Sequence, residues 1–255
     1  TLDLSAASVK LFEPGGKTEG LGIHDILMNT GRVFSVNSAR AFNTTVHTPF
    51  DVRVEKLLKP GILNDEKLSE AFRNSGSYLD SYYHSLICYE YVDRAGTMRY
   101  LRYRMINADR GPERGAYPES FRPLGETFLP PRNDDKRAHD YLRQDFVNRV
   151  KHGGVSYILQ VQMRPTDDPE ALDCTRVWDE RHCPWLDVGE ISVEGDALSA
   201  DALDALEFDV NRTHPCVSLP LATGADDYAS VGHCRALVYA IARKARAQSP
   251  QPHVG

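Results

Sequence analysis

The chain has 255 residues, of which 41% are hydrophobic and 26% charged, and this ordinary globular composition excludes a disordered or fibrous chain. Its formal net charge of −6 excludes a protein that binds nucleic acid or an anionic membrane through charge alone. The longest apolar run, residues 236–242, is far shorter than the ~18 residues of a membrane span, and five cysteines make no disulfide scaffold.

The first half of the chain predicts strands around one helix. Alternating apolar residues indicate strands at 7–12 and 23–29. Asn64, followed by acidic residues, predicts the start of a helix over 64–72. Residues 85–92 and 98–106 are rich in β-branched and aromatic residues, and the turn sequence Asp-Arg-Ala-Gly separates them. These two segments therefore predict a hairpin.

The second half predicts two helices and two strands. After a loop-like stretch, Asn133 is expected to cap a helix that runs to about His152 and ends at two glycines. Strands follow at 155–163 and 186–193, and an alanine-rich helix at 228–248. Many strands with helical insertions and a closing helix predict an α+β fold with an antiparallel sheet or barrel. We expect one domain over residues 1–255.

Several candidate sites have weak support. The His/Cys pairs at 182–183, 214/216 and 233–234 lack the repeated spacing of a zinc site, and we expect buried thiols and surface histidines. The acidic stretch 196–209 fits no calcium motif and is expected to be a solvated face. Five tyrosines between residues 78 and 91 have two interpretations: a platform on which bases or sugars stack, or packing in the core and hairpin. Without a basic stripe, packing is the favoured interpretation.

The last helix carries the strongest signal. Arg235, Tyr239 and Arg243 follow one another at intervals of four residues, which places them on one helical face, and Arg246 follows one turn later. Neighbouring positive charge stabilises a phenolate, and a tyrosinate is one of the ligands that hold haem iron. Arginines further along the helix would pair with the propionates of the haem. The alternative is an ordinary amphipathic helix with solvated arginines.

Motifs along nearly the whole chain resemble the catalase superfamily, in particular its divergent catalase-related haem enzymes. The last helix is similar to the family's Arg-x-x-x-Tyr motif, although Arg243 and Arg246 stand where catalases carry His and Arg. The other matching segments are 7–12 (Ala-Ser-Val-Lys-Leu-Phe), 25–30 (Asp-Ile-Leu-Met-Asn-Thr), 155–163, 177–178 (Val-Trp), 184–191 (Pro-Trp-Leu-Asp-Val-Gly-Glu-Ile) and 206–209 (Leu-Glu-Phe-Asp). The resemblance implies a catalase-like antiparallel β-barrel with surrounding helices.

The resemblance also implies roles for individual residues. Tyr239 would be the ligand of the iron of haem b, with Arg235 holding it as the phenolate. Asn29 would be the distal asparagine that hydrogen-bonds a bound peroxide. The pocket walls would include Phe34 and Phe42, and Arg243 and Arg246 would contact the cofactor.

One element of the family pattern is missing. The family's distal histidine lies well before the asparagine strand, whereas 28 residues precede Asn29 here. The nearest histidine, His24, should point to the opposite face of its strand. We therefore expect the distal histidine, and at least one barrel strand, on a separate N-terminal polypeptide segment.

The implied function is a haem-dependent peroxidase or catalase-like oxidoreductase that activates hydrogen peroxide or an organic hydroperoxide, in specialised metabolism. The altered proximal helix argues against efficient disproportionation of hydrogen peroxide. Two alternatives stay open: a catalytically silent relative that binds or senses haem, and a zinc-dependent or cofactor-free barrel in which the His/Cys pairs converge. We further expect a cytoplasmic homo-oligomer that binds no nucleic acid and spans no membrane.

Overall fold

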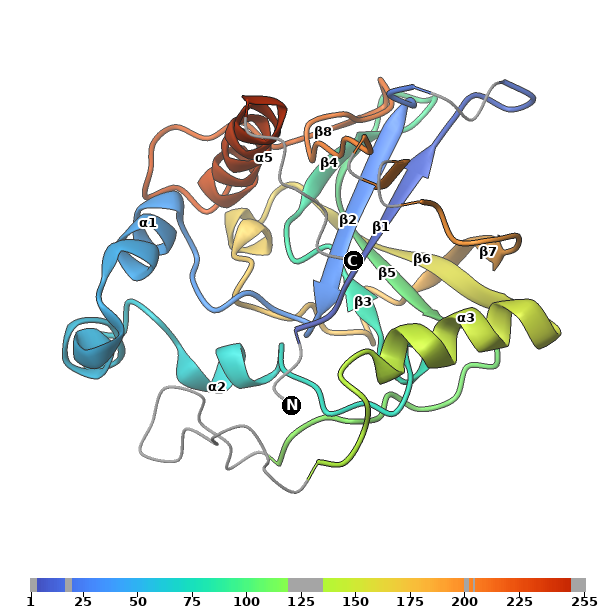
Figure 1. The fold of residues 1–255 in the computed structure, drawn as a ribbon. Helices are drawn as coiled ribbons and strands as arrows, with labels where there is room; N and C mark the ends of the chain where they lie inside the picture. The colour runs from blue at the N-terminus through green and yellow to red at the C-terminus, as the bar shows by residue number, and fades with distance from the viewer. Residues whose placement is uncertain (1–3, 17–19, 119–134, 200–201, 204, 249–255) are drawn as a thin grey trace.

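The computed structural model describes residues 4–16, 20–118, 135–199, 202–203 and 205–248 (Figure 1). Its strands are β1 (Ala6–Leu11), β2 (His24–Thr30), β3 (Tyr83–His84), β4 (Tyr89–Val92), β5 (Met98–Asn107), β6 (Val155–Pro165), β7 (Leu186–Val193) and β8 (Val217–Ser218). Its helices are α1 (Ala39–His47), α2 (Asp65–Ser69), α3 (Tyr141–Gly153) and α5 (Ser230–Gln248), with the short turns η1 (Phe50–Val52), η2 (Val54–Leu58), η3 (Tyr78–Asp80) and η4 (Pro169–Leu172).

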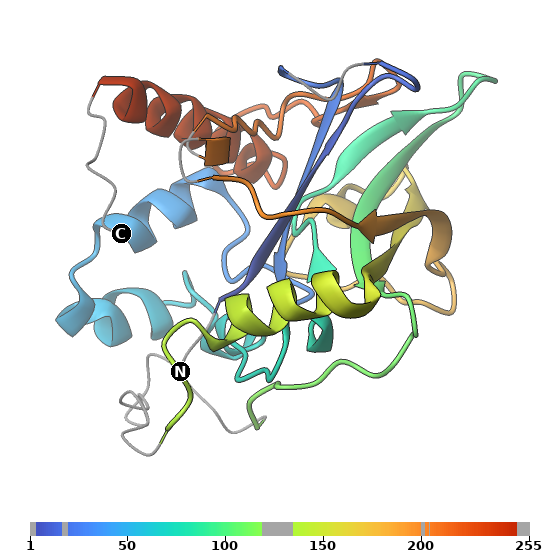
Figure 2. The same ribbon diagram turned by 45° about the vertical axis from the view of Figure 1, so that its right-hand side comes forward.

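All eight strands join one antiparallel sheet. The order is β1-β2-β3-β5-β4-β8, and the long strand β5 also pairs with β6, which in turn pairs with β7. The sheet curls into a half-barrel with helices around it (Figure 1), which confirms the predicted α+β class and the closing helix. Within the described residues β1 and β7 each have one free edge. Figure 2 shows α3 in front of the sheet, and residues of β1, β7 and α3 line a groove of about 580 Å³.

The core follows the alternation of the strands. The odd-numbered residues 101–105 of β5 and 155–161 of β6 belong to the main hydrophobic cluster together with Tyr83, Tyr89 and Val231. Tyr83 and Tyr89 are buried almost completely, and Tyr89 contacts Tyr103 edge to face at 5.6 Å between ring centroids. Packing is therefore the role of these two tyrosines of the 78–91 stretch, as the sequence predicted.

Three predicted element boundaries miss by three residues or more. The helix predicted over 64–72 ends at Ser69, as the short helix α2. The helix expected from Asn133 begins at Tyr141 among the described residues, and Asn133 itself lies outside them. Just before the helix, the Asp135 carboxylate accepts a hydrogen bond from the backbone N–H of Arg137, a local bond that competes with helix formation. The end is as predicted: α3 stops at Gly153, and Gly154 takes φ +75°, a conformation that favours glycine.

The expected strand at 85–92 is shorter than predicted, because β4 begins at Tyr89. Leu86 has φ +60°, and the Ser85 hydroxyl donates to the carbonyl of Ile87 and accepts from the backbone N–H of Tyr103. The backbone N–H of Ser85 still donates to the carbonyl of Tyr103, but the Ser85 hydroxyl takes the place of its own carbonyl as the acceptor of the return bond. The hairpin of β4 and β5 is otherwise confirmed.

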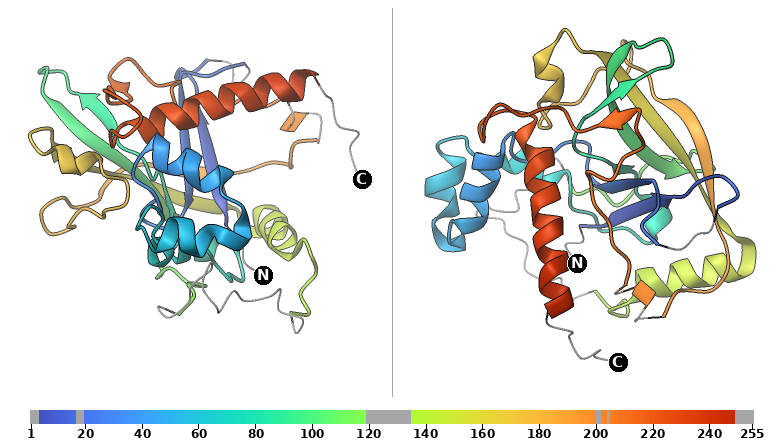
Figure 3. Two further views of the ribbon diagram at one scale, coloured as in Figure 1. Left: turned by 90° about the vertical axis from the view of Figure 1, so that its left-hand side faces the viewer. Right: turned by 90° about the horizontal axis from the view of Figure 1, so that it is seen from above.

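Helix α5 crosses one end of the half-barrel with α1 beside it (Figure 3). The two helices are joined at their starts, where the Ser230 hydroxyl accepts from the backbone N–H of Ala39 at 2.8 Å. Arg40 and Asp226 form an exposed ion pair over the same junction. This junction fixes where α5 begins. Among the described residues, no helix is both long and apolar enough to cross a membrane.

Candidate functional site

Helix α5 presents Arg235 and Tyr239 on the side that packs against the sheet. Alanines at four positions between 236 and 245 favour the helix, and the four-residue spacing stacks the two side chains one turn apart. Tyr239 is half-buried and packs on the main core. A guanidinium N–H of Arg235 donates to the carbonyl of Ser85 at 3.0 Å. The helix therefore holds a phenol and a cation at the edge of an apolar core.

Tyr89 adds an unsatisfied polar group to this edge. Its side chain is fully buried, and its hydroxyl has no hydrogen-bond partner among the described residues. Burial raises the pKa of Tyr89 to about 12, while the positive charge of Arg235 lowers it and Tyr239 raises it. Both α5 residues therefore act on Tyr89 electrostatically, and Tyr89 is a neutral phenol at physiological pH.

The two later arginines of α5 lie apart from this pair. Arg243 approaches Glu207 at 3.6 Å, and Arg246 is exposed. Their side chains occupy the C-terminal half of the helix, where cations also interact favourably with the helix dipole. The structure brings neither of them into the apolar core.

Phe34 and Phe42 are brought together. Their ring centroids lie 5.8 Å apart, and Phe34 contacts both the main core and a smaller cluster beneath α1 that includes Leu57. The backbone N–H of Phe34 donates to the carbonyl of Cys174. This bond fixes the segment after β2, so that Phe34 and Phe42 form an apolar wall between the sheet and α1.

Asn29 belongs to a polar row that crosses the sheet. Register partners in an antiparallel sheet share a face, and the register from β2 to β7 aligns Asn29, His84, Arg104, Gln160 and Asp187. Arg104 donates to the Gln160 amide oxygen at 2.8 Å, and the Gln160 amide nitrogen donates to Asp187 at 2.8 Å. We call these five residues the polar row. Sequence reasoning found only Asn29 of them.

His24 lies on the opposite face of β2, as expected, because the register of β1 and β2 runs without a bulge. Its Nε2 lies 3.1 Å from the Tyr103 hydroxyl, and its Nδ1 accepts from the backbone N–H of His214 at 3.0 Å. Burial lowers the pKa of His24, with a smaller opposing effect of Asp25. Both ring nitrogens of this histidine are therefore already engaged.

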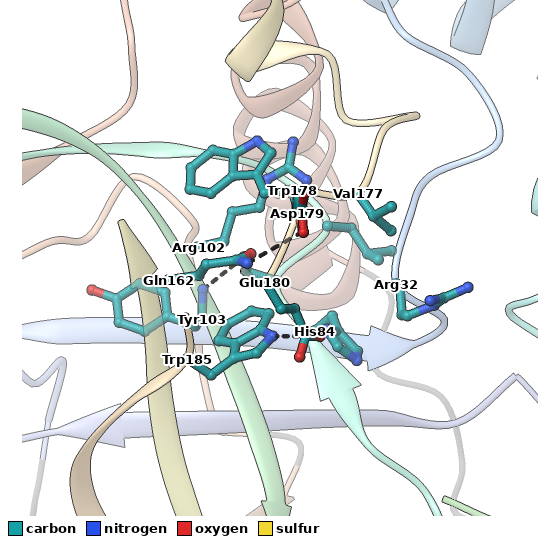
Figure 4. A pocket seen from close by; sticks show the side chains of 12 residues that line it. Arg32, His84, Arg102, Tyr103, Gln162, Val177, Trp178, Asp179, Glu180 and Trp185 are labelled. Carbon is teal, nitrogen blue, oxygen red and sulfur yellow. Dashed lines mark hydrogen bonds between the residues drawn. The ribbon is translucent and has the colours of Figure 1, made fainter. Parts of the chain in front are cut away.

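A cavity of about 330 Å³ opens beside His84 of the polar row (Figure 4). The loop after β6 supplies Trp178 and Trp185, which stack on guanidinium groups: Arg102 lies 4.6 Å from the Trp178 ring and Arg104 lies 4.3 Å from the Trp185 ring. The ring of His84 meets Trp185 edge to face at 5.8 Å. The lining therefore combines flat aromatic walls with two arginines, Arg32 and Arg102, and two carboxylates, Asp179 and Glu180, a combination suited to a planar, polar ligand.

His84 is the buried polar group that this cavity leaves unsatisfied. Its Nε2 has no hydrogen-bond partner among the described residues. Burial, followed by the charges of Arg104 and other arginines, holds the pKa of His84 well below its usual value. The imidazole is therefore neutral at physiological pH. The sequence signal that could have found this site is the Arg-x-Arg pattern at 102 and 104, which puts two cations on one face of a central strand.

The three His/Cys pairs do not converge. His182 contacts Asp179, His214 contacts Cys216, and His233 contacts the carbonyl of Pro220. In the described part of the chain no three His, Cys, Asp or Glu side chains gather where they could hold a metal ion. The arrangement gives no support to the zinc-dependent alternative.

Comparison with known proteins identifies relatives of this chain. No protein-family model matches the chain. An uncharacterized protein, y4iK, of Sinorhizobium fredii is 46% identical over 230 residues, a match that covers 88% of this chain and 99% of that protein. A linolenate 9R-lipoxygenase of Nostoc is 33% identical over 89% of this chain but 29% of its own length. A catalase-related peroxidase of Mycolicibacterium paratuberculosis is 23% identical over 80% of this chain and 61% of its own length.

Solved catalases share the fold. A bacterial catalase superposes with a TM-score of 0.63 at 16% identity, covering 88% of this chain and 43% of the catalase. A fungal catalase superposes with a TM-score of 0.61 at 18% identity, covering 87% of this chain and 44% of the catalase. The chain thus spans less than half of the solved catalases and less than a third of the lipoxygenase it matches. The chain is a divergent, catalase-like member of the catalase superfamily.

Proposed function

We propose that this chain is a haem-binding oxidoreductase that acts on a hydroperoxide, with Tyr239 as the ligand of the iron in haem b. The observation that carries the proposal is the pairing of a half-buried Tyr239 with Arg235 one helical turn before it. A cation near a phenol favours the phenolate. Among the described residues the Arg235 guanidinium donates one hydrogen bond, to the carbonyl of Ser85, although it carries five N–H groups in all.

The residues around Tyr239 fit a bound haem in their chemistry. The Tyr239 hydroxyl has no hydrogen bond to any described residue, and the nearby Tyr89 hydroxyl is buried without a partner. Phe34 and Phe42 supply an apolar wall, which is what an extended porphyrin face requires. When bound, haem supplies the iron that activates the O–O bond.

The other predicted residues keep their proposed roles. Asn29 would orient the peroxide through its side-chain amide, because a preorganised donor stabilises developing charge. Arg243 and Arg246 would pair with the carboxylates of the cofactor.

The substrate class rests on the relatives. One match is called a peroxidase, and another is called a linolenate lipoxygenase, in which the match covers 29% of the length. These names support a peroxide as the substrate, and an organic hydroperoxide derived from a fatty acid in particular.

A second candidate is a relative that binds haem without turnover. The state of His24 favours it, because both ring nitrogens are engaged and the side chain faces away from Asn29. His84 is the histidine that shares the face of Asn29, and if its imidazole does not take the peroxide proton, proton transfer lacks its base. The two candidates differ in turnover and share the Tyr239 ligand.

Titration of the purified chain with hemin tests the ligand. The unmodified chain should bind one hemin, and Tyr239→Phe should lose stable binding. Tyr91→Phe is the matched control, because Tyr91 is also half-buried against the main core. Equal hemin binding and equal ferric absorbance in the unmodified chain and Tyr239→Phe would refute the ligand assignment.

A further inference from the structure

The thiol of Cys216 contacts the imidazole of His214. The Sγ–Nδ1 distance is 2.9 Å, and the two residues precede the short strand β8 (Val217–Ser218). Cys216 is half-buried and His214 is exposed. A small molecule in solution can therefore reach a thiol that already has a base beside it.

The direction of this hydrogen bond follows from a second contact. The backbone N–H of Cys216 also points at His214 Nδ1, at 3.3 Å. A backbone N–H can only donate, so Nδ1 is the unprotonated nitrogen of the ring. The thiol is consequently the donor of the S–H···N bond. This is the tautomer in which His214 can take the thiol proton and leave a thiolate, the nucleophilic form of cysteine.

The core holds His214 in place. Its backbone N–H donates to Nδ1 of His24, so the proton of neutral His24 is on Nε2, which faces the Tyr103 hydroxyl. Burial lowers the pKa of His24 and keeps it neutral, so it adds no positive charge beside His214 when that ring accepts a proton. A nucleophile with a base in contact is the core of an activated thiol, and His24 anchors the backbone of the residue that carries the base.

The other cysteines have different surroundings in the described structure. Cys88 and Cys174 are buried and donate to the carbonyls of Ala171 and Val36. Burial raises the pKa of both thiols, and that of Cys174 reaches about 12. Burial also raises the pKa of Cys234. Burial therefore opposes thiolate formation at these three positions, whereas Cys216 has a proton acceptor.

We propose that Cys216, with His214 as its base, is a peroxide-reactive thiol separate from the proposed haem site. His214 takes the thiol proton, and the sulfur attacks the terminal oxygen of a hydroperoxide. The S–O bond forms as the O–O bond breaks, and the proton on His214 goes to the leaving alkoxide. The thiol is oxidised by two electrons to a sulfenic acid, and the hydroperoxide is reduced to an alcohol, or to water when the oxidant is hydrogen peroxide.

The test uses haem-free protein, hydrogen peroxide and dimedone, which labels sulfenic acids, followed by peptide mass spectrometry. In the unmodified chain, Cys216 should be labelled first of the five cysteines. His214→Gln should slow its labelling by about tenfold or more, since a positioned base accelerates proton transfer. The matched control is His182→Gln, beside Cys183, whose histidine contacts Asp179; it should leave Cys216 labelling unchanged.

Two results would overturn the assignment. One is labelling of Cys183 at a rate equal to or above that of Cys216 in the unmodified chain, a comparison that needs no variant. The other is an unchanged rate in His214→Gln whose circular dichroism matches that of the unmodified chain. Because the experiment contains no haem, neither result depends on the ligand assignment of Tyr239.

Discussion

Asn29 and His84 are register partners across β2 and β3, so their side chains share one face of the sheet. Asn29 is half-buried, whereas His84 is buried and its Nε2 has no partner in the described structure. The residue proposed to orient peroxide therefore stands beside a neutral imidazole. The cavity bounded by Trp178 and Trp185 opens next to that imidazole.

Substitution of Asn29 by alanine tests its proposed role. In hemin-loaded protein, Asn29→Ala should lower kcat/KM for an organic hydroperoxide by about 10²-fold, because it removes one preorganised hydrogen-bond donor. Hemin affinity should stay unchanged. The control is Asn148→Ala, an exposed position on α3. Steady-state kinetics that give equal kcat/KM for Asn29→Ala and the unmodified enzyme would remove Asn29 from the mechanism.

The stability of the chain should fall on acidification. Burial holds the pKa of His84 and of His24 below the usual 6.5, so the unfolded chain binds these protons before the folded chain does. Between the folded and unfolded pKa values, each such histidine makes stability rise with pH by about 1.4 kcal/mol per pH unit. Stability is fully present above about pH 6.5 and is lost as the pH drops below that value.

Urea unfolding at pH 7, 6 and 5 measures this slope. His84→Gln should lower the slope of stability against pH by the amount that one bound proton contributes, ~1.4 kcal/mol per pH unit. His152→Gln should leave the slope unchanged, because His152 is exposed. A slope in His84→Gln that equals that of the unmodified chain would mean that His84 is not a buried neutral imidazole.

Arg104 links the polar row to the wall of the cavity. It donates to Gln160 and stacks on Trp185, and its side chain is only 14% exposed. Arg104→Met keeps most of the volume but leaves the Gln160 amide oxygen without its donor, which costs roughly 1–3 kcal/mol. Arg99→Met, at an exposed position of the same strand, is the matched control. Equal unfolding free energies for the two variants would show that the Arg104–Gln160 hydrogen bond of the polar row does not stabilise the fold.

Tyr89→Phe, unlike Arg104→Met, should not lower the stability of the fold. It removes a buried hydroxyl that has no partner among the described residues, and such a group is unfavourable by about 1–3 kcal/mol in mutational data. We expect the haem-free variant to be as stable as the unmodified chain or more so in denaturant unfolding. A loss of more than ~1 kcal/mol, the typical net worth of a hydrogen bond, would show that the hydroxyl has a partner.

Local patterns in the sequence were sufficient to predict most elements. Strand β7 (Leu186–Val193) was predicted residue for residue, and the Asn64 cap of α2 is present. Helix α1 was not predicted, because Asn43, Thr44 and Thr45 have low helix propensity. What places α1 is tertiary contact, since its first backbone N–H is bonded to Ser230, 191 residues away.

The site was predictable only where it lies on one element. Arg235 and Tyr239 share a helix, so their spacing was visible in the sequence. The polar row draws one residue from each of five strands, and only the register of the sheet aligns them. His84 also stands in a two-residue strand, β3, which is too short for an alternation pattern to reveal it.

Resonance Raman spectroscopy of the hemin-loaded chain tests the central proposal most directly. Excitation into the phenolate-to-iron charge-transfer band should enhance tyrosinate ring modes in the unmodified chain and in Tyr91→Phe. These modes should be absent from any hemin that Tyr239→Phe retains. Their absence from the unmodified chain, or their persistence in Tyr239→Phe, would contradict a haem held by the Tyr239 phenolate.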